Sequence, residues 1–162
     1  MYKTLGKGVE IRPSELSDIV YLKSRLRQED VDEIYASNHL TPTDALTYSF
    51  YLSKVCLTIV KDEPIGMFGI VEDPTDSDRA IIWMLGSDRM SKVSRNIIRD
   101  ARDFIDGLMD SYGTLYNHVD ARNGKSIRWL EHLGAEIDDA VTFGREGLPF
   151  HKFQFRRRII HA

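Results

Sequence analysis

The apolar residues in the first third of the chain recur at the spacing of helices. A short strand at 9–12 is followed by Ser14, which can cap a helix that ends near Gln28, because apolar side chains return every three or four positions at Leu16, Ile19, Val20, Leu22 and Leu26. An acidic segment at 30–37 begins a second helix. The segment 41–52 starts with a capping Thr, a Pro and an Asp, which predicts a third helix.

The pattern then changes to that of strands. The runs 55–60 and 65–71 are apolar and rich in β-branched residues, and the polar segment 61–64 between them predicts a hairpin. Gly66 and Gly69 lie inside the second run, where a missing side chain indicates a bulge or a close approach of another segment. Cys56 lies within the first run, and we interpret it as a core residue.

The remaining chain alternates between strands and helices. The continuous apolar run 80–85 is typical of a central strand covered on both faces. The other expected elements are, in order, a long helix at 91–109, a strand at 115–119, a helix at 124–133 between a capping Asn123 and a terminating Gly134, and strands at 135–137 and 150–156. This order predicts one α/β domain (α+β in its element order) over residues 1–162, with a mixed sheet of six or seven strands flanked by helices and a basic tail at 156–162.

Composition and charge narrow the function classes. The formal charge of −3 gives no general attraction to DNA or RNA, so nucleic acid is disfavoured as a partner. No apolar stretch approaches the roughly 20 residues that span a bilayer, and no secretory signal follows the first residues, so we expect a protein that stays where it is made. The histidines are scattered without metal-ligand spacing, and we expect no metal site.

The segment 119–134 carries a likeness to a known family. It reads VDARNGKSIRWLEHLG, which resembles the GNAT (N-acetyltransferase-like) motif of an Asn, a small residue three positions later, aromatics and then a Gly. The opening Ile11-Arg12-Pro13 with Asp18, and the hairpin ending in Pro64-Ile65-Gly66, are also similar to that family. The resemblance covers nearly the whole chain and implies a GNAT fold with parallel fourth and fifth strands.

Three phrases resemble a narrower group. Residues 30–36, 67–70 and 83–85 are similar to the small GNAT-like proteins of short-tailed bacteriophages called internal virion protein A. The resemblance implies a phage-encoded protein linked to virion morphogenesis, with phage or host proteins as partners. It also implies a location in the host cytoplasm or in association with the virion.

The family resemblance marks a loop for acetyl-CoA. GNAT enzymes bind the pyrophosphate on backbone N–H groups with the pattern Arg/Gln-x-x-Gly-x-Gly/Ala. Here the loop reads RMSKVS over 89–94, so Arg89 fits while Lys92 and Ser94 replace the glycines and place a Cβ at each point of close approach. The candidate cofactor residues are Leu85, Arg89, Lys92, Val93, Ser94, Arg95, Asn123 and Trp129.

Alternative interpretations accompany these residues. Arg89, Lys92 and Arg95 either compensate for the glycines by binding an anion or form a solvated helix start. Asn123 either binds the pantetheine arm, as the family implies, or only caps its helix. Trp83 and Trp129 are interpreted as core residues rather than groove residues, and the run Arg156 to Arg158 with His161 as a solvated tail rather than a docking patch.

The usual catalytic groups are missing from their places. In the family, a Tyr commonly acts as the general acid that protonates the departing thiolate. Leu130 occupies its position here and has no proton to donate. The strand 80–85 contains no carboxylate, which leaves four candidates near strand ends that are also explicable as structural or solvated groups: Asp88, Glu72, His118 and Asp120. We therefore expect weakened or lost acyl transfer and weak binding of acetyl-CoA, and the alternative is an active N-acetyltransferase acting on a host or phage protein.

The topology makes one further prediction. GNAT sheets part between the fourth and fifth strands, here 80–85 and 115–119, so that the acyl-pantetheine arm lies between them. We expect an opening bordered by Leu85, Gly86, Arg89, His118, Asp120 and Asn123. Packing of Trp83 or Trp129 into the gap would instead favour an interaction protein.

Overall fold

A computed structural model of the chain describes residues 3–5, 8–93 and 96–157. Its helices are α1 (Leu16–Leu22), α2 (Gln28–Asn38), α3 (Pro42–Leu52), the short 3₁₀ helix η1 (Asp88–Lys92), α4 (Asn96–Leu108) and α5 (Gly124–Leu133). Its strands are β1 (Lys3–Leu5), β2 (Val9–Pro13), β3 (Val55–Lys61), β4 (Glu63–Glu72), β5 (Arg79–Gly86), β6 (Thr114–Asp120), β7 (Glu136–Ile137), β8 (Val141–Phe143) and β9 (Leu148–Arg156).

The strands form one mixed sheet. Their order is β1-β2-β3-β4-β5-β6-β9-β7, and β8 pairs with β9 beside this path. The pairs are antiparallel except for β5 and β6, which run parallel. The expected α/β domain, with the strand over 80–85 parallel to the strand over 115–119, is therefore confirmed. The short strands β1 and β8 add to the six or seven that the pattern predicted.

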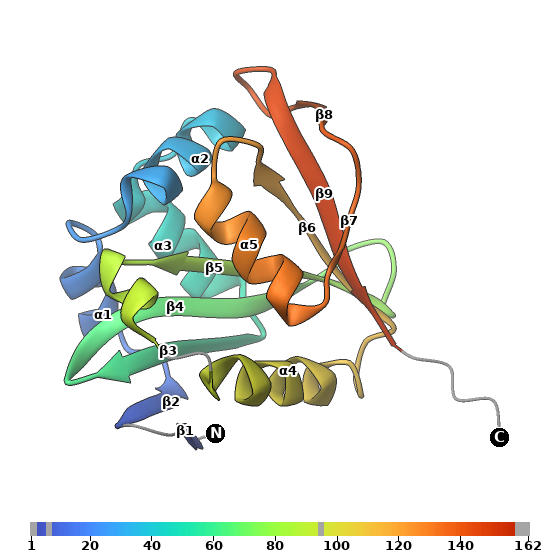
Figure 1. Ribbon diagram of the computed structural model, residues 1–162. Coiled ribbons are helices and arrows are strands. Elements are labelled where there is room, and N and C mark those ends of the chain that lie inside the picture. The colour runs from blue at the N-terminus through green and yellow to red at the C-terminus, as the bar shows by residue number, and fades with distance from the viewer. Residues whose placement is uncertain (1–2, 6–7, 94–95, 158–162) are drawn as a thin grey trace, which may run out of the picture.

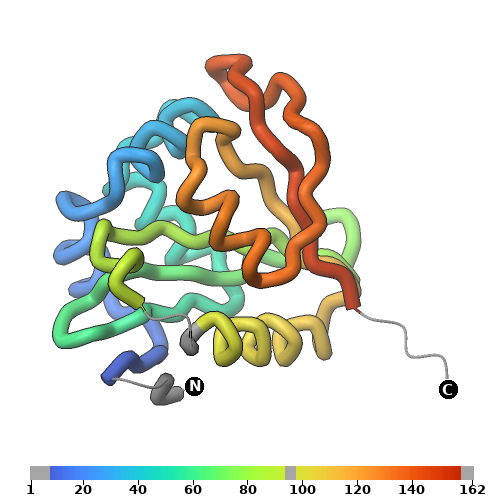
Figure 2. Tube along the Cα trace, viewed as in Figure 1, coloured from blue at the N-terminus to red at the C-terminus, as the bar shows by residue number. Residues whose placement is uncertain are grey.

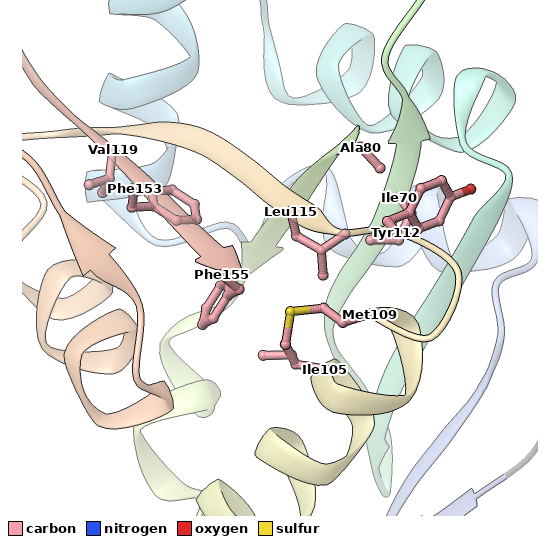
Figure 3. Packing of buried hydrophobic residues seen from close by; sticks show 9 residues of the cluster. All are labelled: Ile70, Ala80, Ile105, Met109, Tyr112, Leu115, Val119, Phe153 and Phe155. Atoms are coloured by element: carbon pink, nitrogen blue, oxygen red, sulfur yellow. The ribbon is translucent and has the colours of Figure 1, made fainter. Parts of the chain in front are cut away.

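Helices cover both faces of this sheet. Figure 1 shows α4 and α5 in front of the sheet and α1, α2 and α3 behind it. On the front, Ile105 and Met109 point from the α4 segment toward Leu115 of β6 and Phe155 of β9, as Figure 3 shows. On the back, a second apolar cluster joins α1 and α3 to β4 and β5, and Cys56 of β3 is half-buried against it. This burial raises the pKa of the Cys56 thiol.

The first helix is shorter than its apolar pattern predicts. It ends at Leu22 rather than near Gln28, because the Arg27 backbone N–H donates to the Gly86 carbonyl at 2.9 Å and draws the chain against the end of β5. The cap is Glu15, which forms a reciprocal capping box with Asp18, while the predicted cap Ser14 bonds through its hydroxyl to Thr58.

The long helix predicted over 91–109 is interrupted. The segment 88–92 forms η1, Val93 is extended, and α4 starts only at Asn96. Met90 explains the break, because its side chain is buried against Gly86 and holds η1 to the sheet. The fourth strand is therefore followed by a 3₁₀ turn and only then by the α-helix.

The basic tail begins later than predicted. Arg156 belongs to β9 and forms an ion pair with Glu136 of β7 at 2.7 Å, and Arg157 donates to the Met109 carbonyl at 2.8 Å. These two side chains are thus held by the fold. Arg158 and His161 lie outside the described residues.

Gly69 is required by a close approach, as its position in the strand pattern predicted. It lies opposite Trp83 in the β4–β5 register, and the Trp83 indole N–H donates to the Ser53 hydroxyl at 2.7 Å across it. A Cβ at Gly69 would lie 2.5 Å from the Val55 carbonyl oxygen and 2.8 Å from the Trp83 indole nitrogen. Backbone and a held ring therefore leave no room for a methyl group.

We predict that Gly69→Ala lowers the free energy of unfolding by about 1–3 kcal/mol, because the added methyl forces the Val55 backbone or the Trp83 ring to move. Urea denaturation measures the change. Gly107→Ala is the matched control, since Gly107 lies in α4 with no atom within 4 Å of the new Cβ, and it should raise stability by up to ~1 kcal/mol. Equal effects of the two substitutions would contradict the argument.

Candidate functional site

The two parallel strands separate after three residue pairs. β5 and β6 pair at Arg79 with Thr114, Ala80 with Leu115, and Ile81 with Tyr116, and no further pair follows. In Figure 1 both strands start near each other on the right and diverge, with α5 in front of the space between them. The predicted splay is confirmed.

Asn117 takes the place of the next interstrand hydrogen bond. Its side-chain amide nitrogen donates to the Ile82 carbonyl at 2.8 Å, and its side-chain oxygen accepts the His118 backbone N–H at 2.8 Å. In a continued parallel ladder, the His118 N–H faces the Ile82 carbonyl directly. The carboxamide of Asn117 is thus inserted into that bond and holds the strands apart at the start of the opening.

Two carboxylates of α2 accept hydrogen bonds from backbone N–H groups at the ends of β5 and β6. Asp30 accepts the Gly86 N–H at the end of β5 at 2.9 Å, and Glu33 accepts the Asp120 N–H at the end of β6 at 2.8 Å. Figure 2 shows the α2 segment beside the turn between β6 and α5. One helix therefore joins both diverging strand ends and fixes the width of the opening.

Asp30 is the centre of a buried polar network. Its carboxylate forms an ion pair with Arg27 at 3.0 Å and accepts a hydrogen bond from Asn123 at 3.1 Å. The Arg27 guanidinium also donates to the Ser126 hydroxyl at 3.2 Å. Asp30 and Arg27 are almost fully buried. Removal of one charge would leave the other buried without a partner, which typically lowers the stability of the fold by about 3–5 kcal/mol.

Met84 presents its backbone polar groups to the opening. Ile82 and Gly86 both direct hydrogen-bonding groups toward the β6 side, and Met84 lies between them on the same strand. Because alternate residues of a strand share a side, the Met84 N–H and C=O also face away from β4 and into the cleft. An extended chain that carries amide groups can pair with them as a strand does.

Two cavities adjoin the opening. One is a cleft on the α2–α3 side, bounded by those helices and by β8 and β9, and the other is an apolar pocket on the α4–α5 side. Six residues line both spaces: Ile82, Trp83, Met84, Trp129, Leu130 and Phe153. The two cavities are therefore neighbours that share one wall of side chains.

Glu33 is the carboxylate in the α2–α3 cleft. It lines the cleft, and burial raises the pKa of Glu33 to about 8, with a smaller contribution from the charges of Asp30 and Asp120, although the Asp120 N–H bond opposes this rise. Its Oε1 atom also accepts from Asn123 at 3.4 Å. A carboxyl group with this pKa exchanges a proton near neutral pH, which suits a general base.

Glu33 is not distinguished by the sequence alone. The acidic residues of the segment 30–33 indicate the start of a helix, and they look alike. The available signal was the spacing, since Asp30 and Glu33 are three residues apart and share a helix face. That face is turned toward the strand ends only by the tertiary structure.

His118 is the one sequence-predicted catalytic candidate that lines the described cleft. Its ring stacks on Phe143 of β8 with the centroids 3.9 Å apart and the planes at 8°. Burial, with a smaller effect of the positive charge of Lys152, lowers the pKa of His118. The imidazole is therefore held neutral and oriented on one wall.

The other three catalytic candidates lie elsewhere. Glu72 is at the far end of β4, where it pairs with Lys54 at 2.7 Å and accepts from the Tyr112 hydroxyl, and these contacts lower the pKa of Glu72. Asp88 is exposed at the start of η1. Asp120 is buried and pairs with Arg122 at 2.7 Å, so its carboxylate contacts Arg122 while its N–H contacts Glu33.

The cofactor-loop residues are divided between structural and solvated positions. Arg89 donates to the Lys61 carbonyl at 2.6 Å and thus holds η1 to the β3–β4 hairpin, and Lys92 is exposed. Val93 lines the apolar pocket on the α4–α5 side. Ser94 and Arg95 lie outside the described residues.

The remaining cofactor candidates differ in whether their side chains reach the cleft. Leu85 and Trp129 line the cleft, whereas Asn123 is buried, caps α5 by accepting the Ser126 N–H at 3.3 Å, and donates to Asp30. Trp83 and Trp129 are half-buried and line both spaces rather than being enclosed in the core as interpreted from the sequence. Of the residues expected to border the opening, Leu85 and His118 line the cleft, whereas Gly86, Arg89, Asp120 and Asn123 do not. Both indoles lie in its walls.

In the described part of the chain, no group of three His, Cys, Asp or Glu side chains could hold a metal ion. None of its helices combines the length and the apolar character needed to cross a bilayer.

We predict that Glu33→Gln changes how stability depends on pH. Because the folded state keeps the proton of Glu33 up to about pH 8 and the unfolded state releases it near 4.5, the protein loses stability as the pH rises between these values. The substitution removes this loss, so the variant should gain up to ~1.4 kcal/mol per pH unit over the parent in that window.

Chemical denaturation at pH 5, 6, 7 and 8 measures this difference. Glu29→Gln on the same helix is the control, because the bond from its own backbone N–H, helped by Lys125, lowers the pKa of Glu29, and its removal should give no gain with rising pH. Parallel curves for the Glu33 variant and the parent would contradict the prediction.

Sequence comparison finds no relative: no protein-family model matches the chain, and no curated protein matches it at a significant level. Solved structures do match. A putative acetyltransferase from Salmonella typhimurium with its cofactor acetyl-CoA is 13% identical, with a TM-score of 0.65, over 96% of this chain and 98% of that one. A spermidine N-acetyltransferase from Vibrio cholerae, in complex with CoA and spermine, is 14% identical, with a TM-score of 0.67, over 94% and 97%.

A third match, the ribosomal-protein-S5-alanine acetyltransferase from Vibrio fischeri, is 12% identical with a TM-score of 0.65 and covers 100% of both chains. At these identities the likeness concerns the fold, and it extends over the parallel strands and both helical layers. The chain has the fold of GNAT-family acetyltransferases.

Proposed function

We propose that the protein transfers an acyl group from an acyl-CoA thioester to an amine, with weak binding of the cofactor. The observation that carries the proposal is the separation of β5 from β6, beside which lies a cleft with Glu33 in its wall. Neighbouring structures contain acetyl-CoA or CoA, which makes this cofactor the reasonable donor. The Met84 N–H and C=O would bind the amides of its pantetheine arm.

Glu33 supplies the base that the strand 80–85 lacks. It takes a proton from the acceptor ammonium group, and the free amine attacks the thioester carbonyl carbon. The C–N bond forms, the C–S bond breaks, and the nitrogen releases its second proton to water. Water in turn gives a proton to the thiolate, because Leu130 lines the cleft and has none to donate, and Glu33 returns its proton to the solvent.

Weak cofactor binding follows from the loop after β5. Lys92 and Ser94 stand where the family pattern has glycines, and the Arg89 guanidinium is engaged with the Lys61 carbonyl. The backbone cradle for a pyrophosphate thus meets two side chains and lacks a free Arg at its first position. The acyl arm and its thioester would contribute most of the binding.

The expected result of a calorimetric titration with acetyl-CoA is a dissociation constant weaker than ~1 μM, whereas a micromolar or tighter value would contradict the weakened cradle. Release of CoA thiol with an amine acceptor then tests the chemistry. Glu33→Gln should lower kcat/KM by about 10²–10⁴-fold, since it removes the base. Glu29→Gln, outside the cleft, should leave it unchanged, and full activity of the Glu33 variant would refute the assignment.

We further propose that this activity acts on phage or host proteins in the host cytoplasm during virion morphogenesis. The support is the resemblance of residues 30–36, 67–70 and 83–85 to the internal virion protein A family. Deleting the coding sequence from the phage should lower the yield of infectious particles, and supplying the protein from a plasmid should restore it. An unchanged yield would contradict the proposed role in virion morphogenesis.

A further inference from the structure

We infer that the acceptor is the amino terminus of a polypeptide with apolar first residues, which enters the cleft from the α2–α3 side. This inference rests on the proposed acyl transfer and specifies its second substrate. Its basis is the combination of one carboxylate with apolar walls and an exposed aromatic rim.

The charge of the cleft fits a single ammonium group. Glu33 is the one acidic side chain among the described residues that line it, and none of these is Lys or Arg. A polyamine or an aminoglycoside would place its additional ammonium groups against walls that offer no second carboxylate, where an unpaired charge is costly. A molecule with one amine and an uncharged body matches the lining.

The walls beyond Glu33 are mostly apolar and carry no further acidic side chain. Ile34 and Leu40, with Ser37 and Asn38 between them, extend the wall formed by the α2 segment, and Phe143 and Phe150 form the opposite wall from β8 and β9. Phe143 and Phe150 contact each other, with their ring centroids 5.2 Å apart. Apolar side chains that follow an amino terminus would be buried between these walls.

The rim continues the apolar surface away from the cleft. Tyr48 is 57% exposed and Leu52 is 68% exposed, although both line the cleft from α3. Large apolar side chains held in solvent at the mouth of a site commonly mark a contact surface. A small amine would not reach this rim, whereas a polypeptide several residues long would cover it.

The amine itself would meet Glu33. Its Oε1 atom is fixed by the donors of Asp120 and Asn123, and no described side chain or backbone group outside the helix donates to Oε2. An α-amino group has an ordinary pKa of about 7.7–8.0, whereas the pKa of a lysine amine is about 10.4. The carboxylate of Glu33, whose pKa is raised to about 8, therefore deprotonates an α-amine far more easily.

Three acceptors of matched concentration test the inference, with acetyl-CoA as the donor and thiol release as the readout. They are a ten-residue peptide with a free apolar amino terminus, the same peptide acetylated at its amino terminus with a lysine added inside, and spermidine. We expect kcat/KM for the free amino terminus to exceed the other two at least tenfold. Equal or faster reaction of spermidine or of the internal lysine would overturn the inference.

Substitutions in α3 distinguish peptide binding at the rim of the cleft from the acyl-transfer step. Tyr48→Ala should raise KM for the peptide about tenfold and leave kcat and the KM for acetyl-CoA unchanged. Tyr51→Ala is the matched control, because Tyr51 is 67% exposed on the same helix but does not line the cleft, and it should change neither KM. Equal effects of the two substitutions would also overturn the inference.

Binding distinguishes this inference from the proposed reaction. Trp83 and Trp129 line the cleft, so their fluorescence reports occupation by the free-amino-terminus peptide even without turnover. Saturable peptide binding that Tyr48→Ala weakens, without any acyl transfer, would support the polypeptide site and contradict the transferase. Absence of binding for the peptide would overturn the inference, whatever the transferase activity toward other amines.

Discussion

The separation of β5 from β6 is the constraint on which the rest of the site depends. Two parallel strands that part inside a covered sheet leave backbone N–H and C=O groups without their ladder partners, and such groups must find others. Asn117 bonds to the first pair, Asp30 and Glu33 of α2 bind the N–H groups at the two strand ends, and the Met84 groups between them stay open to the cleft. The opening is thus held by side chains that copy the missing ladder.

This arrangement explains why a carboxyl group with a raised pKa lies in the cleft. A helix that offers two carboxylates to two neighbouring strand ends brings negative charges together, and Asp120 adds a third. Arg27 neutralises Asp30, and Arg122 pairs with Asp120, while Glu33 receives only uncharged donors. The structural role of Glu33 at β6 and its suitability as a base therefore have one origin.

The sequence predicted the elements better than their ends. The hydrophobic pattern identified the hairpin and the central strand over 80–85, and the residue types identified the caps at Thr41 and Asn123. Both kinds of signal are local in the sequence. It overestimated the first helix and the helix predicted over 91–109. The contact of Arg27 with Gly86 ends the first helix early, and the contact of Met90 with the same strand end delays the start of the second.

The sequence by itself determined the α/β class, since the order of helix and strand patterns is written along the chain. Its resemblance to the GNAT family implied the parallel pair and identified the positions at which the glycines and the Tyr are replaced. Only the tertiary structure decided which polar groups meet. Glu33 and Asn117 look ordinary in sequence, and Asn123 fits both a helix cap and a contact with the pantetheine arm. Their roles depend on the point at which two strands part, and that point is fixed by long-range packing and hydrogen bonds that no local pattern encodes.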